Sequence, residues 1–593
     1  MDHLTLKALK PTEYAEAAAG YRAISSTADA AVDRIDKQIV TAMRKANEGE
    51  AADAALKQLR KLSENFHYTQ IECGLITGAL DGFSSEIVAP KRRLTAALDD
   101  AAALAYTVNE NGAVMYPAGG KNELTGEPIP GGTVLGNNGL ISGNGSGFQS
   151  PGLVPNNPQF KNPNPHHAKA VDIADRIAHA VREAQEIDSR YSRALNKLKA
   201  PPGLNVDTKT WADAASDVDA VSSAAAQYLQ DHLPLDKSPA DRKEWWDNLS
   251  DEERQEYKTA FPEVIGDLDG IPAVDRDEVN RENLQMLIAK LSGQHDETSR
   301  EQLAGMKGIE EKLSEVSNPP MFLLGIGDQG NGRAIVSYGN PDTSKNISAY
   351  VPGLGTTLNA DFADDTLQRG LDTAKGARMY DPSSASIVWL GYDAPGFAGV
   401  ASTTNADNGA PAYNGFMDGI AATNKNENPH ITAIGHSYGS LTVGTAARQD
   451  GGIPGADDII LLGSPGVGAD KASELNVGKG HVFVGSAGND PVTWLPSKPQ
   501  AVAGLMGGLL PGALADPGGD DVWFGKDPAS EAFGATRFRV SDGPLPFYLA
   551  GIDEGLTPAH SDYFTPSEDQ ESADNIARIV AGKSDSITTE TPR

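Results

Sequence analysis

Cysteine is nearly absent from this chain of 593 residues, since Cys73 is its single thiol. One cysteine cannot form an intramolecular disulfide, so the fold does not depend on an oxidising compartment. Cys73 falls within an apolar helical pattern, and we expect it to be a core residue.

Long apolar runs are also missing. The longest apolar stretch, Ala501 to Ala515, is broken by glycines and Pro511 and is shorter than the roughly 18 residues that a spanning helix needs. Met1 to Lys7 carries no apolar signal core. We therefore expect no stable membrane insertion and no secretory signal peptide. The compartment is left open between the cytoplasm and export by a signal-peptide-independent, type VII-like route.

Positive charge is scarce, because 50 Lys and Arg face 81 Asp and Glu, for a formal net charge of −31. Nucleic acid and anionic membrane surfaces would repel such a chain, so neither is expected as a partner. The length predicts two or three folded units.

The chain is predicted to divide into four segments. Residues 1–107 carry two apolar helical patterns separated at Ala46 to Glu50, which predicts an antiparallel helical hairpin. Residues 108–166 are rich in Gly, Asn and Pro and predict a loop or linker. Residues 167–318 form a helical region, and residues 319–585 an α/β domain.

Several local features refine these segments. His166 and His167 are expected to be a solvated pair rather than metal ligands, because no Cys or acidic cluster joins them. Ser250 and Glu253 predict a helical capping box. Trp245 and Trp246 are expected to pack rather than to bind a ligand.

From residue 319 onward, strands and helices alternate. Met321 to Leu324 and Arg333 to Tyr338 predict a β-hairpin, so the G-x-G-x-x-G match at Gly325 to Gly330 is not a dinucleotide fingerprint, which would have to open a helix. Further strands are predicted near Ile347 to Val351, Ile387 to Leu390, Ile431 to Ile434, Ile459 to Leu462, Val482 to Val484 and Arg537 to Val540. The alternation predicts an α/β fold with a mostly parallel sheet and helices on both faces.

A nucleophile elbow is predicted at Gly435-His436-Ser437-Tyr438-Gly439. An apolar strand precedes it and a helix follows, which is the context in which a serine hydroxyl is held out of a sharp turn. Gly435 and Gly439 would let the strand and helix backbones approach closely. The alternative is a glycine-rich turn without chemistry.

The base and the acid follow from chain order, which is Ser, then Asp or Glu, then His in α/β-hydrolases. After Ser437 only His481 and His560 remain, and His481 opens a strand at the wrong end of the sheet. His560, in a polar loop, is thus the predicted base. Asp490, after the strand Val482 to Val484, is the predicted acid. The alternatives are that Asp490 is only a turn residue, and that Asp470 is the acid.

Two backbone amides are predicted to bind a developing oxyanion. Tyr438, the residue after the nucleophile, supplies one, and Gly353 or Leu354, after an earlier strand, supplies the other. Tyr392 to Gly396 is expected either to line the mouth of the site or to form a tight turn. The apolar segment Pro496 to Gly519 is expected to cap the pocket and to favour an apolar acyl group.

These motifs resemble the actinobacterial α/β-hydrolase family catalogued as domain of unknown function 1023. The resemblance spans about 245–581 and includes Trp245-Trp246, Val351-Pro352-Gly353, Gly391 to Pro395, the elbow, Asn489-Asp490-Pro491 and His560-Ser561-Asp562-Tyr563. It implies an α/β-hydrolase fold behind a helical region, with Ser437, Asp490 and His560 as the triad. It implies no substrate.

The N-terminal hairpin resembles the small Trp-x-Gly substrates of type VII secretion. Asn47-Glu48-Gly49 lies at the turn, and Tyr68 and Glu72 match a Tyr-x-x-x-Glu signal, although the tryptophan is missing. This resemblance implies a helical-hairpin secretion partner.

The leading hypothesis is a serine hydrolase of esters or thioesters, acting on a small-molecule or lipid ester without a cofactor or metal. Lipase, esterase, thioesterase and acyltransferase are left open. The second hypothesis is an exported interaction protein or effector whose hydrolase domain is incidental or inactive.

Overall fold

The fold is described from a computed structural model, which describes residues 1–123, 125–136, 162–199, 205–396, 399–494, 521–544 and 558–593. Two compact units make up the described chain. Unit 1 holds Met1–Val206 and Ser216–Leu233, and unit 2 holds Asp207–Ala215 and Pro234–Arg593. The predicted cap at 496–519 lies outside the described residues.

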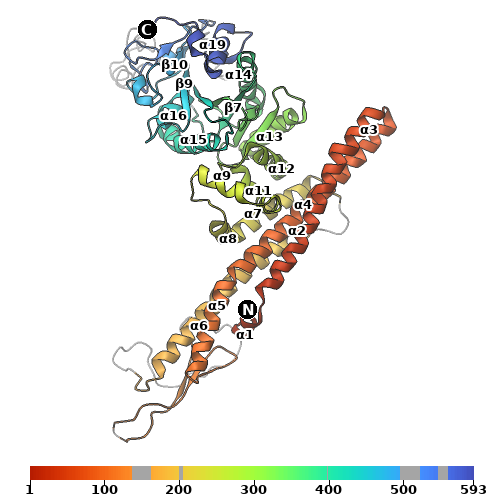
Figure 1. The fold of residues 1–593 in the computed structure, drawn as a ribbon, viewed down its shortest axis with the longest axis vertical. Coiled ribbons are helices and arrows are strands. Elements are labelled where there is room, and N and C mark those ends of the chain that lie inside the picture. The colour runs from red at the N-terminus through yellow and green to blue at the C-terminus, as the bar shows by residue number, and fades with distance from the viewer. Residues whose placement is uncertain (124, 137–161, 200–204, 397–398, 495–520, 545–557) are drawn as a thin grey trace. The chain divides into compact units, whose positions relative to one another are not determined.

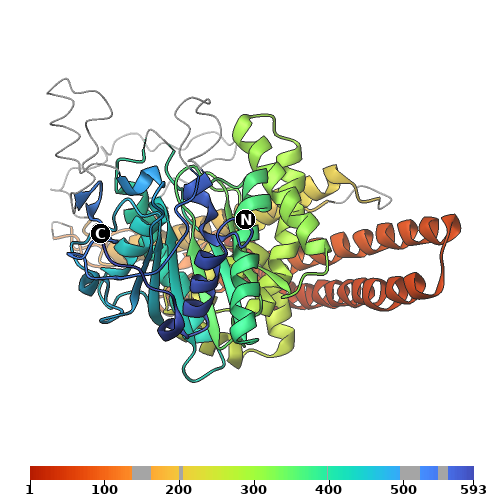
Figure 2. The same cartoon turned by 90° about the horizontal axis from the view of Figure 1, so that it is seen from above.

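Unit 1 is built on a long helical hairpin. Its first arm runs through α2 (Pro11–Asp33), the π-helical η1 (Arg34–Val40) and α3 (Thr41–Ala46), and its second arm is α4 (Glu50–Glu86). Figure 2 shows the two arms lying side by side in opposite directions. The Ser25 hydroxyl donates to the Gln70 carbonyl at 2.8 Å, and Arg22 pairs with Asp81 at 2.7 Å. The predicted helical N-terminal region is confirmed.

Further helices of unit 1 are α1 (His3–Ala8), α5 (Val88–Ala103), α6 (His167–Lys197) and α8 (Ala226–His232), while α7 (Thr208–Ala224) has residues in both units. Figure 1 shows α5 and α6 running alongside one another. Arg176 on α6 pairs with Asp100 on α5 at 2.6 Å, and the Tyr191 hydroxyl donates to Glu86 at 2.6 Å. Ala97, Ala101, Ala174 and Ala180 are buried, so small side chains let these helices pack closely.

The described residues within 108–166 do not form only the loop or linker that the sequence predicts. Their described part includes an antiparallel sheet of β1 (Thr107–Val108), β2 (Val114–Tyr116) and β3 (Gly132–Val134). Val114 and Tyr116 alternate with the exposed Met115, and this short pattern was hidden by the Gly and Pro around it. His166 is half-buried and shares a hydrogen bond of 3.0 Å with the Tyr106 hydroxyl, so the histidine pair is not simply solvated.

Helices precede the sheet in unit 2, namely α9 (Pro239–Asn248), α10 (Asp251–Ala260), α11 (Pro262–Asp267), α12 (Ala273–Ser292) and α13 (Glu297–Ser314). The capping box of Ser250 and Glu253 opens α10 as predicted, and Trp246 is buried. On α12, Asp277 accepts from the amide of Leu323 at 2.7 Å. Residues 234–318 therefore group with the sheet, which differs from the predicted segments.

Eight strands of the described chain form one sheet, in the order β13-β10-β9-β8-β6-β7-β5-β4. Their bounds are β4 (Met321–Gly327), β5 (Arg333–Tyr338), β6 (Asn346–Val351), β7 (Ser384–Leu390), β8 (His430–His436), β9 (Ala456–Leu462), β10 (Val482–Gly485) and β13 (Thr536–Arg537). The pair β4–β5 is antiparallel, as the predicted hairpin requires, and Gly325 lies inside β4. Strands β7, β6, β8, β9, β10 and β13 pair in parallel.

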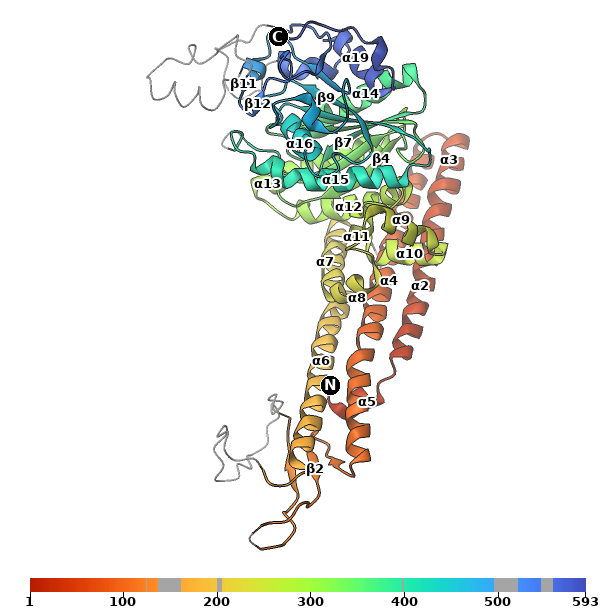
Figure 3. The same cartoon turned by 60° about the vertical axis from the view of Figure 1, so that its left-hand side comes forward.

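Helices cover both faces of this sheet. Figure 3 shows α15 (Thr404–Thr423) and α16 (Tyr438–Ala447) on one side, with α14 (Leu367–Tyr380) and α19 (Gln570–Val580) on the other. Along β6, Ala349 packs on the side of α15 and α16 and Tyr350 on the side of α14 and α19, since neighbouring side chains of a strand point to opposite faces. The α/β fold class is thereby confirmed. Shorter elements are η2 (Phe362–Thr366), η3 (Ala472–Leu475), η4 (Pro491–Trp494), β11 (Asp521–Val522), β12 (Gly525–Lys526), α18 (Pro558–Ser561), η6 (Asp562–Phe564) and η7 (Ser584–Ser586).

None of the described helices has the length and apolar character required to cross a membrane.

Candidate active site

Ser437 occupies a strained turn between β8 and α16. Its φ of +56° and ψ of −130° lie outside the regions that residues with a side chain normally adopt. The amide of Ser437 donates to the Leu462 carbonyl at 2.9 Å, which fixes the turn against β9. Strain of this kind persists only where the surroundings impose it, and it commonly marks a functional position.

The two glycines of the motif are required by close packing at this turn. A Cβ on Gly435 would lie 2.6 Å from the Cα of Ser440, and a Cβ on Gly439 would collide with the Val351 carbonyl oxygen. The backbones of β8, α16 and β6 therefore approach one another because neither position carries a side chain.

The structure brings Asp490 and His560 together, although they lie 70 residues apart in the chain. His560 Nδ1 is 2.9 Å from both carboxylate oxygens of Asp490. A carboxylate only accepts, so Nδ1 carries the proton and Nε2 of the neutral ring is left as an acceptor. Asp490 is fully buried, and His560 is 2% exposed.

His560 lies in the short helix α18 rather than in a polar loop, which corrects the predicted setting. Its Nε2 is buried and has no hydrogen-bond partner among the described residues. An unpartnered buried acceptor is costly, so this nitrogen is suited to a group that is present only during binding or reaction.

Asp490 is held by two further donors. Its Oδ1 accepts from the amide of Val492 at 2.9 Å, and its Oδ2 accepts from the Tyr563 hydroxyl at 2.7 Å. The bond to Val492 is the turn bond that the alternative interpretation expected, so Asp490 shapes its turn and also contacts His560. These donors compensate for burial of the carboxylate.

Gly463, after β9, leaves room for the side chains of Asp490 and His560. Its φ is +51°, and a Cβ there would lie 2.7 Å from Asp490 Oδ2 and 2.8 Å from His560 Nδ1. Only glycine meets both the backbone and the steric requirement at this position.

His436 packs beneath the pair. Its Nε2 donates to the His560 carbonyl at 2.6 Å, and the two rings are 4.7 Å apart. Burial, followed by repulsion from the protonated form of His560 and from Arg369, holds the pKa of His436 well below its usual range. His436 is therefore a neutral support for the backbone that carries His560.

The loop after β6 approaches the elbow directly. A Cβ on Gly353 would lie 2.6 Å from the Cβ of Ser437 and 2.8 Å from the amide nitrogen of Tyr438. This brings the Gly353–Leu354 backbone beside the Tyr438 amide, where two oxyanion donors would have to lie. The Tyr392 hydroxyl donates to the Pro352 carbonyl at 2.7 Å, so Tyr392 braces this loop. Tyr392 to Gly396 do not line the pocket described next.

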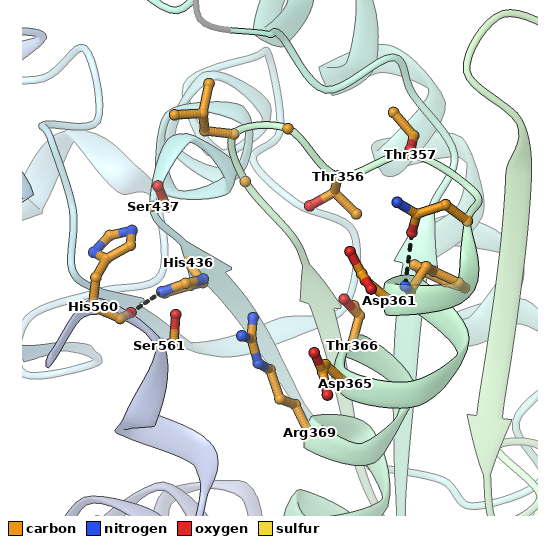
Figure 4. Close-up of a pocket in the computed structure, with 15 residues that line it drawn as sticks. Thr356, Thr357, Asp361, Asp365, Thr366, Arg369, His436, Ser437, His560 and Ser561 are labelled. Atoms are coloured by element: carbon orange, nitrogen blue, oxygen red, sulfur yellow. Dashed lines mark hydrogen bonds between the residues drawn. The ribbon is translucent and has the colours of Figure 1, made fainter. Parts of the chain in front are cut away.

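Ser437 and His560 line one pocket of about 230 Å³, together with His436 and Ser561. Figure 4 shows these residues at one wall and Thr356, Thr357, Asp361, Asp365, Thr366 and Arg369 at the other. Gly353 and Leu354 also contribute to the lining.

The rejected candidates lie elsewhere. His481 Nδ1 contacts Asp458 at 2.7 Å, just before β10 begins and thus at the opposite end of that strand from Asp490. Asp470 is exposed and does not line the pocket.

No role was assigned from the sequence to three residues that take part in this geometry. Gly463 and Arg369 gave no local signal, because their importance depends on contacts between distant segments. Tyr563 stood in the resemblance motif three residues after His560, and that spacing was the available signal.

The parallel sheet, the strained serine at the end of a strand and the buried Asp–His pair define an α/β hydrolase. A family model described as alpha/beta hydrolase matches residues 328–499. The uncharacterized protein Rv2079 of Mycobacterium tuberculosis is 28% identical over 457 residues, which cover 71% of this chain and 67% of that protein. The uncharacterized proteins Rv0963c of M. tuberculosis and Mb0988c of Mycobacterium bovis are each 34% identical over 242 residues, which cover 37% of this chain and 90% of each relative. The chain belongs to the alpha/beta hydrolase family.

Proposed function

We propose that the chain is a serine hydrolase that cleaves carboxylic esters or thioesters through an acyl-enzyme on Ser437. The observation that carries this proposal is the contact of His560 Nδ1 with Asp490 at 2.9 Å, in the pocket that also contains the strained Ser437.

The chemistry follows from the tautomer that Asp490 imposes. His560 Nε2 accepts the proton of the Ser437 hydroxyl as Oγ attacks the ester carbon, and Asp490 stabilises the resulting imidazolium. The amides of Tyr438 and of Gly353 or Leu354 bind the oxyanion. The imidazolium then protonates the leaving alcohol or thiol. Water, deprotonated by His560, hydrolyses the acyl-enzyme and restores Ser437.

A fluorophosphonate probe tests the nucleophile. We expect the wild type to be labelled, Ser437→Ala to be unlabelled and His560→Ala to be labelled far more slowly. Ser567→Ala is a matched control, because Ser567 is exposed and does not line the pocket. A folded wild type that resists the probe would overturn the proposal.

Hydrolysis and acyl transfer share the same residues and differ in the acceptor. Turnover of a p-nitrophenyl ester in the presence of an added alcohol separates them, since a transferase forms the new ester and a hydrolase forms the acid.

The narrower resemblance to domain of unknown function 1023 and the helical-hairpin secretion partner stay predictions. In α4, Tyr68 and Glu72 are both buried, which a displayed export signal would not be.

A further inference from the structure

The wall of the pocket opposite His560 is polar. It is formed by the loop after β6, by η2 and by the first turn of α14. Phe362 of η2 is apolar, whereas the polar residues Thr356, Thr357, Asp361, Asp365, Thr366 and Arg369 make up most of this wall. Ligand pockets are usually lined mainly by apolar side chains with a few polar groups, so this composition is unusual. A long alkyl group here would strip water from carboxylates and a guanidinium without replacing their hydrogen bonds.

The charged side chains of this wall do not form ion pairs with one another. Within the described part of the chain, Arg369 has no carboxylate within 4 Å, and its hydrogen bond goes to the Tyr350 hydroxyl at 3.2 Å. Asp361 and Asp365 are exposed and likewise form no ion pair with any described residue. Figure 4 shows the Arg369 guanidinium directed into the pocket.

The balance of charge favours a neutral ligand. Two carboxylates and one guanidinium line the wall, so an anionic group would meet net repulsion. Carboxylates only accept hydrogen bonds, guanidinium only donates them, and threonine hydroxyls do both. The ligand group that satisfies all three kinds at once is a set of neighbouring hydroxyls.

We infer that the ester cleaved at Ser437 is an acyl ester of a polyhydroxylated alcohol, whose hydroxyls bind Asp361, Asp365 and Arg369. This inference rests on the proposed function. It places the alcohol in the polar pocket, where the buried and unpartnered Nε2 of His560 can protonate the leaving oxygen. A volume of about 230 Å³ suits one small group of this kind, since it lies below the roughly 300 Å³ at which pockets for larger ligands begin.

The test compares acetates that share an acyl group and differ in the alcohol. A 6-O-acetyl monosaccharide and 1-monoacetylglycerol are the polyol substrates, and n-hexyl acetate is the apolar control. We expect kcat/KM for at least one polyol acetate to exceed that for hexyl acetate by tenfold or more. The better of the two polyols then identifies a carbohydrate or a glycerol source.

Variants connect the preference to the pocket wall. We expect Asp365→Asn and Arg369→Gln to lower kcat/KM on the preferred polyol acetate about tenfold more than on p-nitrophenyl acetate, mainly through KM. Asp364→Asn is the matched control, because Asp364 lies one residue away on η2 and does not line the pocket. A preference for hexyl acetate, or equal effects of Asp365→Asn and Asp364→Asn, would overturn the inference.

The two levels of the proposal fail differently. If p-nitrophenyl acetate is hydrolysed in a Ser437-dependent manner without a polyol preference, only the substrate class is wrong. If the folded protein hydrolyses no ester and resists the fluorophosphonate probe, the hydrolase function falls, and the substrate class falls with it.

Discussion

Tyr563 donates its phenolic hydrogen to Asp490 Oδ2 at 2.7 Å, and the same oxygen is 2.9 Å from His560 Nδ1. The Tyr563 oxygen also accepts a hydrogen bond from the amide of Ala487 at 3.0 Å, so one buried hydroxyl connects the backbone just after β10 to the acid, which in turn contacts His560. Burial, followed by the charge of Asp490, raises the pKa of Tyr563 well above its usual range, which keeps the hydroxyl protonated as a donor.

Tyr563→Phe is expected to lower kcat by about 10- to 100-fold with little change in KM. A hydrogen bond to a charged group contributes about 1.5–3 kcal/mol, and without it Asp490 orients His560 less firmly. Steady-state kinetics on a p-nitrophenyl ester measure the effect. Tyr380→Phe is the control, because Tyr380 also donates to a carboxylate, that of Asp574, but lies away from the pocket. Equal kcat values for the two variants would contradict a positioning role for Tyr563.

Ser437→Gly is expected to be more stable than Ser437→Ala by about 1 kcal/mol. Both variants remove the hydroxyl, but only glycine relieves a φ of +56°, and the gain exceeds the extra chain entropy that glycine loses on folding. Chemical denaturation measures the difference. The same pair of substitutions at Ser567, which has no positive φ, is expected to favour alanine. The opposite order at Ser437 would show that the turn stores no strain.

The sequence predicts the parts of this site that depend on a short local pattern or on chain order. The Ser437 elbow is a local pattern of strand, turn and helix, so it can be recognised from the sequence alone. Asp490 and His560 were reached by chain order and by the end of the strand that each follows. Gly463, Arg369 and the second bond of Tyr563 depend on segments that meet only in the folded chain, so no local pattern announces them. The strands β1 to β3 were missed because they are two or three residues long.

Gly353→Ala is expected to lower kcat by about 100-fold or more. The new Cβ would lie 2.6 Å from the Cβ of Ser437, so the loop must shift, and one oxyanion donor typically contributes about 2.7–4 kcal/mol. The ratio of kcat to that of the wild type is the measurement. Gly396→Ala is a suitable control, since nothing lies within 4 Å of a Cβ at that position. A Gly353→Ala enzyme with wild-type kcat would remove this loop from the oxyanion site.

Stability is expected to fall below pH 6.5 because of His436. Its pKa is lowered in the folded state, so the unfolded chain binds a proton that the folded chain does not, and the stabilisation present above the ordinary value of 6.5 is lost as pH falls. The slope of the free energy of unfolding reaches at most about 1.4 kcal/mol per pH unit. Denaturation at pH 7.5 to 5 should show a steeper loss for the wild type than for His436→Asn.

His430 provides a control of opposite sign for this experiment. Burial lowers the pKa of His430, but Asp458, Asp457 and the Ile579 carbonyl raise it by more, so its folded pKa is raised. Its contribution is therefore present below 6.5 and is lost as pH rises. The difference between wild type and His430→Asn should shrink toward high pH, whereas that for His436→Asn should shrink toward low pH. Parallel curves for both variants would contradict the two assignments.

Three separate segments of the chain meet at the Asp490–His560 contact. Gly463 at the end of β9 leaves room there for Asp490 and His560, which come from two later segments. Bringing together Asp490 and His560, which are 70 residues apart in the chain, is slow compared with forming the local turn at Ser437. During refolding, the capacity to react with a fluorophosphonate should consequently appear after most of the helical circular dichroism has returned. Probe reactivity would then time the last step of assembly, when the C-terminal segment docks.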